Sequence, residues 1–431
     1  MQFFNTLGSL INQRWKKANY NEQSFPEIAS RALSELPPHT HVSLWDVARW
    51  ALQVDELPFQ PDLAARFGDP PLTVFTGRGF RIDVLFWTQG TPSIHQHAFS
   101  GAFHVLQGSS LHSLWEFEPT ERLEVRLLLG RVAFLRSEML KQGDSRPIYA
   151  GSRMFHSTYH LDRPTLSVVV RTVSEADERP QYTLLPPTIA FAELDIVPSV
   201  QRQSQILKML ATAGKWGEYS EVARHALGTK DAYSVFQLLL STFDQVEDEE
   251  ERAELLMTAS CIHPNLVEAL RPALLRQESG HRMVQMYRKC ESRELRLFLA
   301  LLRNIPDGTA ILDLVRRLYP TRDPITTVVS WVRQLSESGL LEFEFQESWL
   351  VMLLCLLMGL SDQEIRAAFN DHCISEQISD ADLETLAWSL RNSWLLQPLF
   401  AYHASAAPRM ELPDYGPAPR RQMESTEGSW Q

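Results

Sequence analysis

The stretch Ile94-His95-Gln96-His97 contains the residues best suited to chemistry. Side chains of a β-strand alternate between its two faces, so histidines separated by one residue direct their imidazoles to the same side. A strand can in this way offer two nitrogen ligands to one metal ion. A third ligand has to come from elsewhere in the chain, and His156, in Arg153-Met154-Phe155-His156, is the best candidate.

Three neutral imidazoles can hold a divalent metal and leave coordination positions open, as an enzyme site requires. A single histidine in a strand is more often a packed polar residue, but the paired spacing and the third histidine ahead of another strand favour a metal site. His160 is the alternative third ligand, although Asp162 and Pro164 shortly after it indicate a turn. His104 and His112 are further histidines without an assigned role.

Residues 72–196 have the pattern of a β-domain. From Phe80 to Trp87 the apolar residues Phe80, Ile82, Val84 and Phe86 fall on one face, which is typical of a strand. Further short strands are expected at Ser110–Glu118, Leu123–Leu129, Arg131–Arg136 and Pro164–Val173, separated by turn residues. Many short strands of this kind predict an antiparallel sandwich or barrel.

Helical patterns flank this domain on both sides. Residues 1–71 are expected to form a helical segment that packs on the barrel, with a capping box at Ser43–Asp46 and a face of Trp45, Ala48 and Leu52. Residues 197–403 are expected to be all-α, and the apolar stretch Trp349–Leu360 to be a core helix. Residues 404–431 are rich in proline and predict a disordered tail. The fold class is therefore α+β multidomain.

Composition excludes several classes of protein. The chain has 431 residues and a formal net charge of −12, which argues against sequence-independent binding of nucleic acid. Its apolar stretches are shorter than the ~20 residues of a membrane helix, and its N-terminus lacks a signal-peptide pattern. The four cysteines, Cys261, Cys290, Cys355 and Cys373, are interpreted as buried thiols. We expect a cytoplasmic protein.

The stretch from Gly79-Phe80 through His95-Gln96-His97 to Gln107-Gly108 resembles a cupin, and within the cupins the cysteine dioxygenase group. Such cupins carry an H-x-H pair, a strand that ends in glycine and a later single histidine. Most cupins add a glutamate ligand four or five residues after the second histidine, where this chain has Gly101 and Ala102. The thiol dioxygenases also lack it and bind Fe(II) through three histidines. The resemblance therefore implies Fe(II) with O2 as co-substrate, with zinc or manganese as alternatives.

The chain differs from the thiol dioxygenases at the positions that determine substrate specificity in that group. A later strand of the thiol dioxygenases reads Ser-x-His-x-Tyr, and here Ser167 agrees while Val169 and Arg171 replace the histidine and the tyrosine. The region Gly68–Pro71 also has no arginine in register with the family's carboxylate clamp. Free cysteine is therefore not the expected substrate.

Arg171 is the replacement with the clearest chemical meaning. If it points inward with Ser167, its guanidinium suits a carboxylate or phosphate on the substrate, whereas an outward Arg171 would be an ordinary salt-bridged strand residue. We assign catalytic roles to Arg171, Tyr159 and Ser167. Substrate binding is assigned to Arg81, Arg171 and Phe99, although the polar face of the Arg81 strand is equally compatible with solvent.

Three functions fit these observations. The first is an Fe(II)-dependent oxygenase that acts on a small or carrier-bound substrate. The second is a non-redox metal enzyme, a hydrolase, isomerase or lyase, in which the metal acts as a Lewis acid. The third is a regulatory cupin that binds a ligand without catalysis. The helical half would cover the barrel, form a homodimer interface or bind a partner protein.

Overall fold

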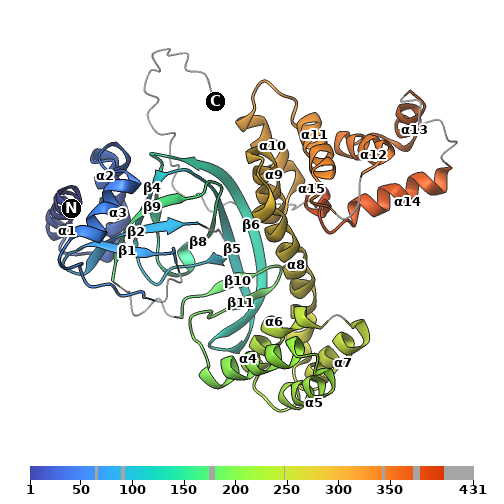
Figure 1. Cartoon of the computed structure of the whole chain (residues 1–431), viewed down its shortest axis with the longest axis horizontal. Helices are drawn as coiled ribbons and strands as arrows, with labels where there is room; N and C mark the ends of the chain where they lie inside the picture. Colours follow the sequence, from blue (N-terminus) through green and yellow to red (C-terminus); the bar gives the residue numbers. More distant parts are fainter. Residues whose placement is uncertain are drawn as a thin grey trace.

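The structure, a computed structural model, describes residues 1–63, 67–88, 93–173, 180–246, 248–341, 345–371 and 379–401. Helices α1 (Gln2–Lys17), α2 (Phe25–Glu35) and α3 (Leu44–Gln53) precede the strands (Figure 1). The strands are β1 (Pro71–Thr76), β2 (Phe80–Trp87), β3 (Ile94–His95), β4 (Gly101–Gln107), β5 (Ser109–Glu124), β6 (Leu127–Lys141), β7 (Ser145–Ile148), β8 (Phe155–His160), β9 (Thr165–Thr172), β10 (Thr183–Leu185) and β11 (Ile189–Phe191). The later helices are α4 (Pro198–Thr212), α5 (Trp216–Leu227), α6 (Ala232–Thr242), α7 (Glu249–Ser260), α8 (Pro264–Lys289), α9 (Arg293–Asn304), α10 (Gly308–Leu318), α11 (Pro324–Glu337), α12 (Glu347–Met358), α13 (Asp362–Asp371), α14 (Asp380–Arg391) and α15 (Gln397–Phe400).

The strands form two sheets in which all pairings between these strands are antiparallel. One sheet has the order β1-β2-β9-β4-β7. In the other the order is β10-β11-β6-β5-β8-β3, and β10 also pairs with β3, so its hydrogen bonding runs in a ring. The prediction of antiparallel sheets combined with many helices is confirmed.

The N-terminal helices cover the first sheet. Phe80, Ile82 and Val84 alternate along β2 and are fully buried in one cluster with Phe4 and Leu7 of α1. This alternation orients the strand, because a shift of one residue would turn its apolar side chains away from the helices. Figure 1 shows α1, α2 and α3 together on this side of the sheets. The opposite face of β2 carries the polar residues Arg81 and Asp83, followed by Leu85 and Trp87.

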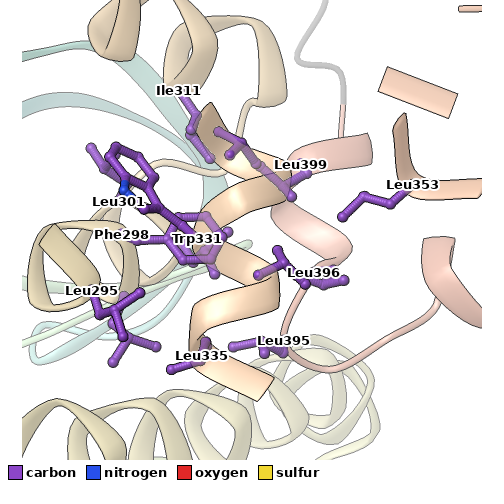
Figure 2. Packing of buried hydrophobic residues seen from close by; sticks show 14 of the residues in the cluster. Leu295, Phe298, Leu301, Ile311, Trp331, Leu335, Leu353, Leu395, Leu396 and Leu399 are labelled. Atoms are coloured by element: carbon purple, nitrogen blue, oxygen red, sulfur yellow. The ribbon is translucent and has the colours of Figure 1, made fainter. Parts of the chain in front are cut away.

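The later helices pack against the second sheet and against one another. Phe298 of α9 and Trp331 of α11 lie at the centre of a cluster that continues into α15 through Leu399 (Figure 2). Leu111 of β5 and Tyr159 of β8 belong to the same cluster, so helices and strands share one apolar core. Because α12 contributes several of its residues, the prediction of a core helix within Trp349–Leu360 is confirmed.

The expected strand at Leu123–Leu129 is wrong. Residues 123–124 end β5, residues 127–129 begin β6, and Val125 and Arg126 form the turn between them. The expected Arg131–Arg136 strand lies inside β6. This turn contains no glycine, proline or asparagine, so the sequence gives no signal that the chain reverses there.

Two expectations about side-chain burial are also wrong. Ser43 and Asp46 do form the capping box of α3, but Trp45 and Leu52 are 72% and 87% exposed and Val47 is the buried residue. Cys261 is exposed because it caps the C-terminus of α7, whereas Cys290 and Cys355 are buried free thiols.

Some expectations fall outside the described residues, namely the tail at 404–431 and the state of Cys373. Across the residues that the structure describes, none of the helices has the length and apolar character needed to cross a membrane.

Candidate metal centre

Three histidines converge where β3 meets β8. His95 lies directly opposite His156 in the pairing of these two strands. His97 follows shortly after β3, where its backbone bridges to Ala150 and its carbonyl accepts a hydrogen bond from the Gly151 N–H at 2.8 Å. One nitrogen of each imidazole lies within 4.8 Å of the others, and the Nε2 atoms of His97 and His156 are 2.8 Å apart.

The two paired histidines do not share one continuous strand. β3 ends at His95, and the bridge to Ala150 holds His97 separately. Their rings nevertheless meet at a centroid distance of 4.7 Å. The same-side arrangement expected from alternation is thus reached by a short strand followed by a bridge.

The electrostatics of the cluster suit neutral imidazoles. Burial lowers the pKa of His95, His97 and His156, and the neighbouring histidines lower the pKa of His97 and His156 further. Arg171 adds to the effect on His97. Neutral imidazole nitrogens are the form that binds a divalent metal, and these donor atoms lie close enough to share one ion, so the residues fit such a metal.

Two of the three imidazoles have a partner at the ring nitrogen that faces away from the cluster. His95 donates from Nδ1 to the Ser93 carbonyl at 3.0 Å. His156 bonds through Nδ1 to Nε2 of His112 at 3.1 Å, and Nδ1 of His112 lies 3.0 Å from Oε1 of Glu138. Such partners orient metal-binding histidines and fix which nitrogen carries the proton.

Glu138 is ionised in this arrangement. Burial by itself would raise its pKa, but hydrogen bonds from His112 and Arg146 outweigh burial and hold the pKa far below its ordinary value. Arg146 donates to both carboxylate oxygens, from Nε at 2.9 Å and from Nη2 at 2.5 Å. Sequence reasoning left His112 without a role and did not identify Glu138.

Arg171 lies beside the histidines with its guanidinium 3.4 Å above the ring centroid of Phe99. The Phe99 ring in turn lies 4.4 Å from the ring of His97. Burial first, and then the Arg81 charge, lower the pKa of Arg171 to about 9, so it stays charged at neutral pH. Among the described residues Arg171 has no hydrogen bond or salt bridge, and its Nε is buried without a partner.

Arg81 is engaged elsewhere on the same sheet face. It stands opposite Arg171 in the pairing of β2 with β9, and its Nε donates to Asp83 at 2.8 Å. Asp83 also accepts a hydrogen bond from the Thr73 hydroxyl at 2.7 Å. Arg81 therefore has a direct ion pair with Asp83. Arg171 has no such direct pair among the described residues, although the charges of Asp83 and Asp62 also act on it.

The remaining candidates lie away from the cluster or lack a contact with it. The ring of Tyr159 packs on Tyr287 of α8 at 4.9 Å, within the helical core, so the structure does not bring it to the histidines. Ser167 is buried, but no hydrogen bond among the described residues links it to a histidine. His160 bonds through Nδ1 to Ser110 and stacks on Trp87, apart from the three grouped histidines.

The backbone at Gly101 explains why no carboxylate follows the histidine pair. A Cβ atom at Gly101 would lie 2.0 Å from the Val170 carbonyl oxygen and 3.0 Å from the Arg171 Cα. Ala102 points to the other side of β4, into the cluster under the N-terminal helices. Neither position can present an acidic side chain to His95 or His97.

We expect Gly101→Ala to lower the free energy of unfolding by about 1–3 kcal/mol, the usual cost of forcing an extra methyl group into a packed site. Urea denaturation would measure the change. The matched control is Gly217→Ala on α5, where an added Cβ meets nothing within 4 Å and alanine favours the helix. Equal stability of G101A and wild type would show that β4 and β9 can move apart.

The stability of the fold should fall in mild acid because of His160. Burial lowers the pKa of His160 to about 3, so the folded state favours the neutral ring, whereas the unfolded chain binds a proton near pH 6.5. The stabilisation is complete above about pH 6.5 and is lost on acidification towards about pH 3. Between about pH 7.5 and 5.5 the wild type should lose ~1.4 kcal/mol more than His160→Gln in urea unfolding. Identical losses would contradict this assignment.

No protein-family model matches the chain, and no curated protein matches it. Among solved structures, hydroquinone 1,2-dioxygenase PnpCD in complex with Cd2+ and 4-hydroxybenzonitrile is 15% identical over 23% of this chain and 61% of that chain, with a TM-score of 0.19. DMSP lyase DddQ from Ruegeria pomeroyi DSS-3 is 18% identical over 34% of this chain and 72% of that chain, with a TM-score of 0.18.

A third similar structure, recombinant oxalate oxidase in complex with glycolate, is 14% identical over 42% of this chain and 62% of that chain, with a TM-score of 0.17. The chain thus spans about three fifths of the length of the dioxygenase and oxidase chains that it matches. At these TM-scores the likenesses carry no argument about activity.

Proposed function

We propose that this chain is a metal-dependent oxygenase of the cupin type. One Fe(II) ion is held by His95, His97 and His156, and the substrate is a small or carrier-bound anion other than free cysteine. The observation that carries the proposal is the convergence of three neutral imidazoles, with donor atoms within 4.8 Å of one another, beside the half-buried guanidinium of Arg171.

The three-histidine set is suited to this chemistry. Imidazole ligands bind iron, and three of them leave positions for both a substrate atom and O2. When bound, Fe(II) supplies the redox chemistry that no protein side chain provides. The chain itself contributes the orientation of the ligands and an apolar wall, in which Phe99 and Phe103 belong to a buried cluster with Val169. That wall excludes water from the reacting atoms.

Arg171 selects an anionic substrate in this proposal. Its planar guanidinium can bind a carboxylate or phosphate through two parallel N–H hydrogen bonds, and the ring of Phe99 holds the guanidinium in place. Arg171 is half-buried and feels the charges of Asp83 and Asp62, but it forms no hydrogen bond among the described residues, so its guanidinium donors are available to an anionic ligand. Free cysteine is disfavoured because the positions that resemble the thiol dioxygenase strand hold Val169 and Arg171.

The proposal is tested with anaerobically Fe(II)-loaded protein and a small-molecule extract fractionated by anion exchange, with oxygen consumption recorded by electrode. Oxygen uptake is expected in an anionic fraction, with neither Zn-loaded protein nor Fe-treated His97→Ala consuming oxygen. Turnover of a fractionated compound by Zn-loaded protein without oxygen uptake would overturn the oxygenase in favour of a non-redox metal enzyme.

A further inference from the structure

A line of polar side chains crosses neighbouring strands on the face that carries the histidines. Glu138 of β6 stands directly opposite His112 of β5. His112 lies two residues before Leu114, which is the cross-strand partner of His156 on β8. His156 in turn faces His95 on β3. Residues at such positions share one face of a sheet, which is why their side chains meet.

The hydrogen bonds in this line determine where the protons lie. Both oxygens of Glu138 accept hydrogen bonds from Arg146, so Nδ1 of His112 is the donor to Oε1 of Glu138 at 3.0 Å. With Nδ1 of His112 as the donor, its Nε2 is the acceptor for the Nδ1–H of His156 at 3.1 Å. Nε2 of His156 is left as a lone pair, and this is the atom that faces His97.

We propose that His112 and Glu138 are positioning residues that fix His156 as an Nε2 ligand and bring the charge of a carboxylate to the metal through two hydrogen bonds. The proposal rests on the metal site proposed above. The grouped ligands are all neutral histidines, so the carboxylate acts through His112 and His156 rather than by direct ligation.

Neighbouring side chains hold His112 and Glu138 in place. Arg146 binds both oxygens of Glu138 and sets the orientation of the carboxylate. The ring of Phe103 lies 5.6 Å from that of His112 and 6.1 Å from that of His156. The His112 side chain is 2% exposed, so its hydrogen bonds act where water screens little.

The test measures the Kd for Co(II) by competition with a chromophoric chelator, and the reduction potential of the Fe-loaded protein. Glu138→Gln removes the charge, His112→Leu removes the acceptor for His156, and His112→Gln keeps an acceptor oxygen. The matched control is Glu118→Gln, which removes a carboxylate from an exposed salt bridge with Arg131 on the same β5–β6 hairpin.

We expect E138Q and H112L each to raise the Kd for Co(II) by about 10–100-fold, the usual effect of removing a partner of a metal-binding histidine. H112Q should lie closer to wild type than H112L, and E118Q should not change the Kd. The iron potential should become more positive in E138Q because a negative charge favours Fe(III).

A double variant shows whether Glu138 acts on the Kd for Co(II) through His112 or independently of it. Because Glu138 acts through His112, H112L/E138Q should bind Co(II) no more weakly than H112L alone. E138Q with wild-type melting temperature, Kd and iron potential would overturn the proposal, and so would fully additive effects in the double variant. Wild-type protein that binds no Co(II) would overturn the metal site itself, which is a distinguishable result.

Discussion

Replacing His97 with alanine should raise the Kd for a divalent metal by about 100- to 1000-fold. The binding free energy of a structural zinc site with four ligands is about 10–16 kcal/mol, so the loss of one ligand costs several kcal/mol. Each ~1.4 kcal/mol corresponds to a tenfold change in Kd. The Nε2 atom of His97 lies 2.8 Å from that of His156, so its removal leaves only two grouped imidazoles. Chelator competition with Co(II) or Zn(II) measures the change.

The control for this variant is His104→Ala. His104 is also a fully buried imidazole, but it pairs with His39 at 2.9 Å and with Ser145, outside the group of three histidines. Its loss should leave the metal Kd unchanged even if the fold is destabilised. Equal weakening by H97A and H104A would mean that metal binding follows stability rather than ligation.

Replacing Arg171 with methionine should weaken the binding of carboxylate anions by about 100-fold. Loss of one partner of a buried, hydrogen-bonded charge pair costs roughly 2–5 kcal/mol, and methionine keeps the apolar contact with Phe99 without the charge. Acetate or oxalate titrated into Co(II)-loaded protein, followed by the Co(II) absorption bands, serves as the probe. R171K should be intermediate because lysine keeps the charge but lacks the planar fork.

Arg131→Met is the matched control, because Arg131 forms an exposed pair with Glu118 and its loss should not affect anion binding. Anion affinity that is the same in R171M and wild type would show that Arg171 balances charge within the fold rather than binding substrate.

The sequence predicted the metal-binding candidates because their signal is local. Two histidines separated by one residue need only a short extended segment to face the same way, and the apolar face of β2 was visible at Phe80, Ile82 and Val84. The third histidine could be proposed from its place ahead of a strand. The choice of His156 over His160 needed the register of β8 against β3.

The rest of the site depends on registers that cannot be counted along the chain. His112 and Glu138 meet through the long β5–β6 hairpin, whose pairing is irregular at three points. Each irregularity shifts which residues stand opposite, so the sequence alone does not bring these two together. The position of Tyr159, by contrast, follows from alternation alone. It lies three residues after His156 on β8, so it points to the opposite face and packs on Tyr287 of α8.

The central claim is that His95, His97 and His156 bind one metal ion, and X-ray absorption of protein loaded with one equivalent of zinc tests it most directly. We predict three imidazole nitrogens at ~2.0–2.1 Å with water completing the shell, and loss of one imidazole in H97A. A sulfur ligand, or a shell without imidazole, would contradict the claim.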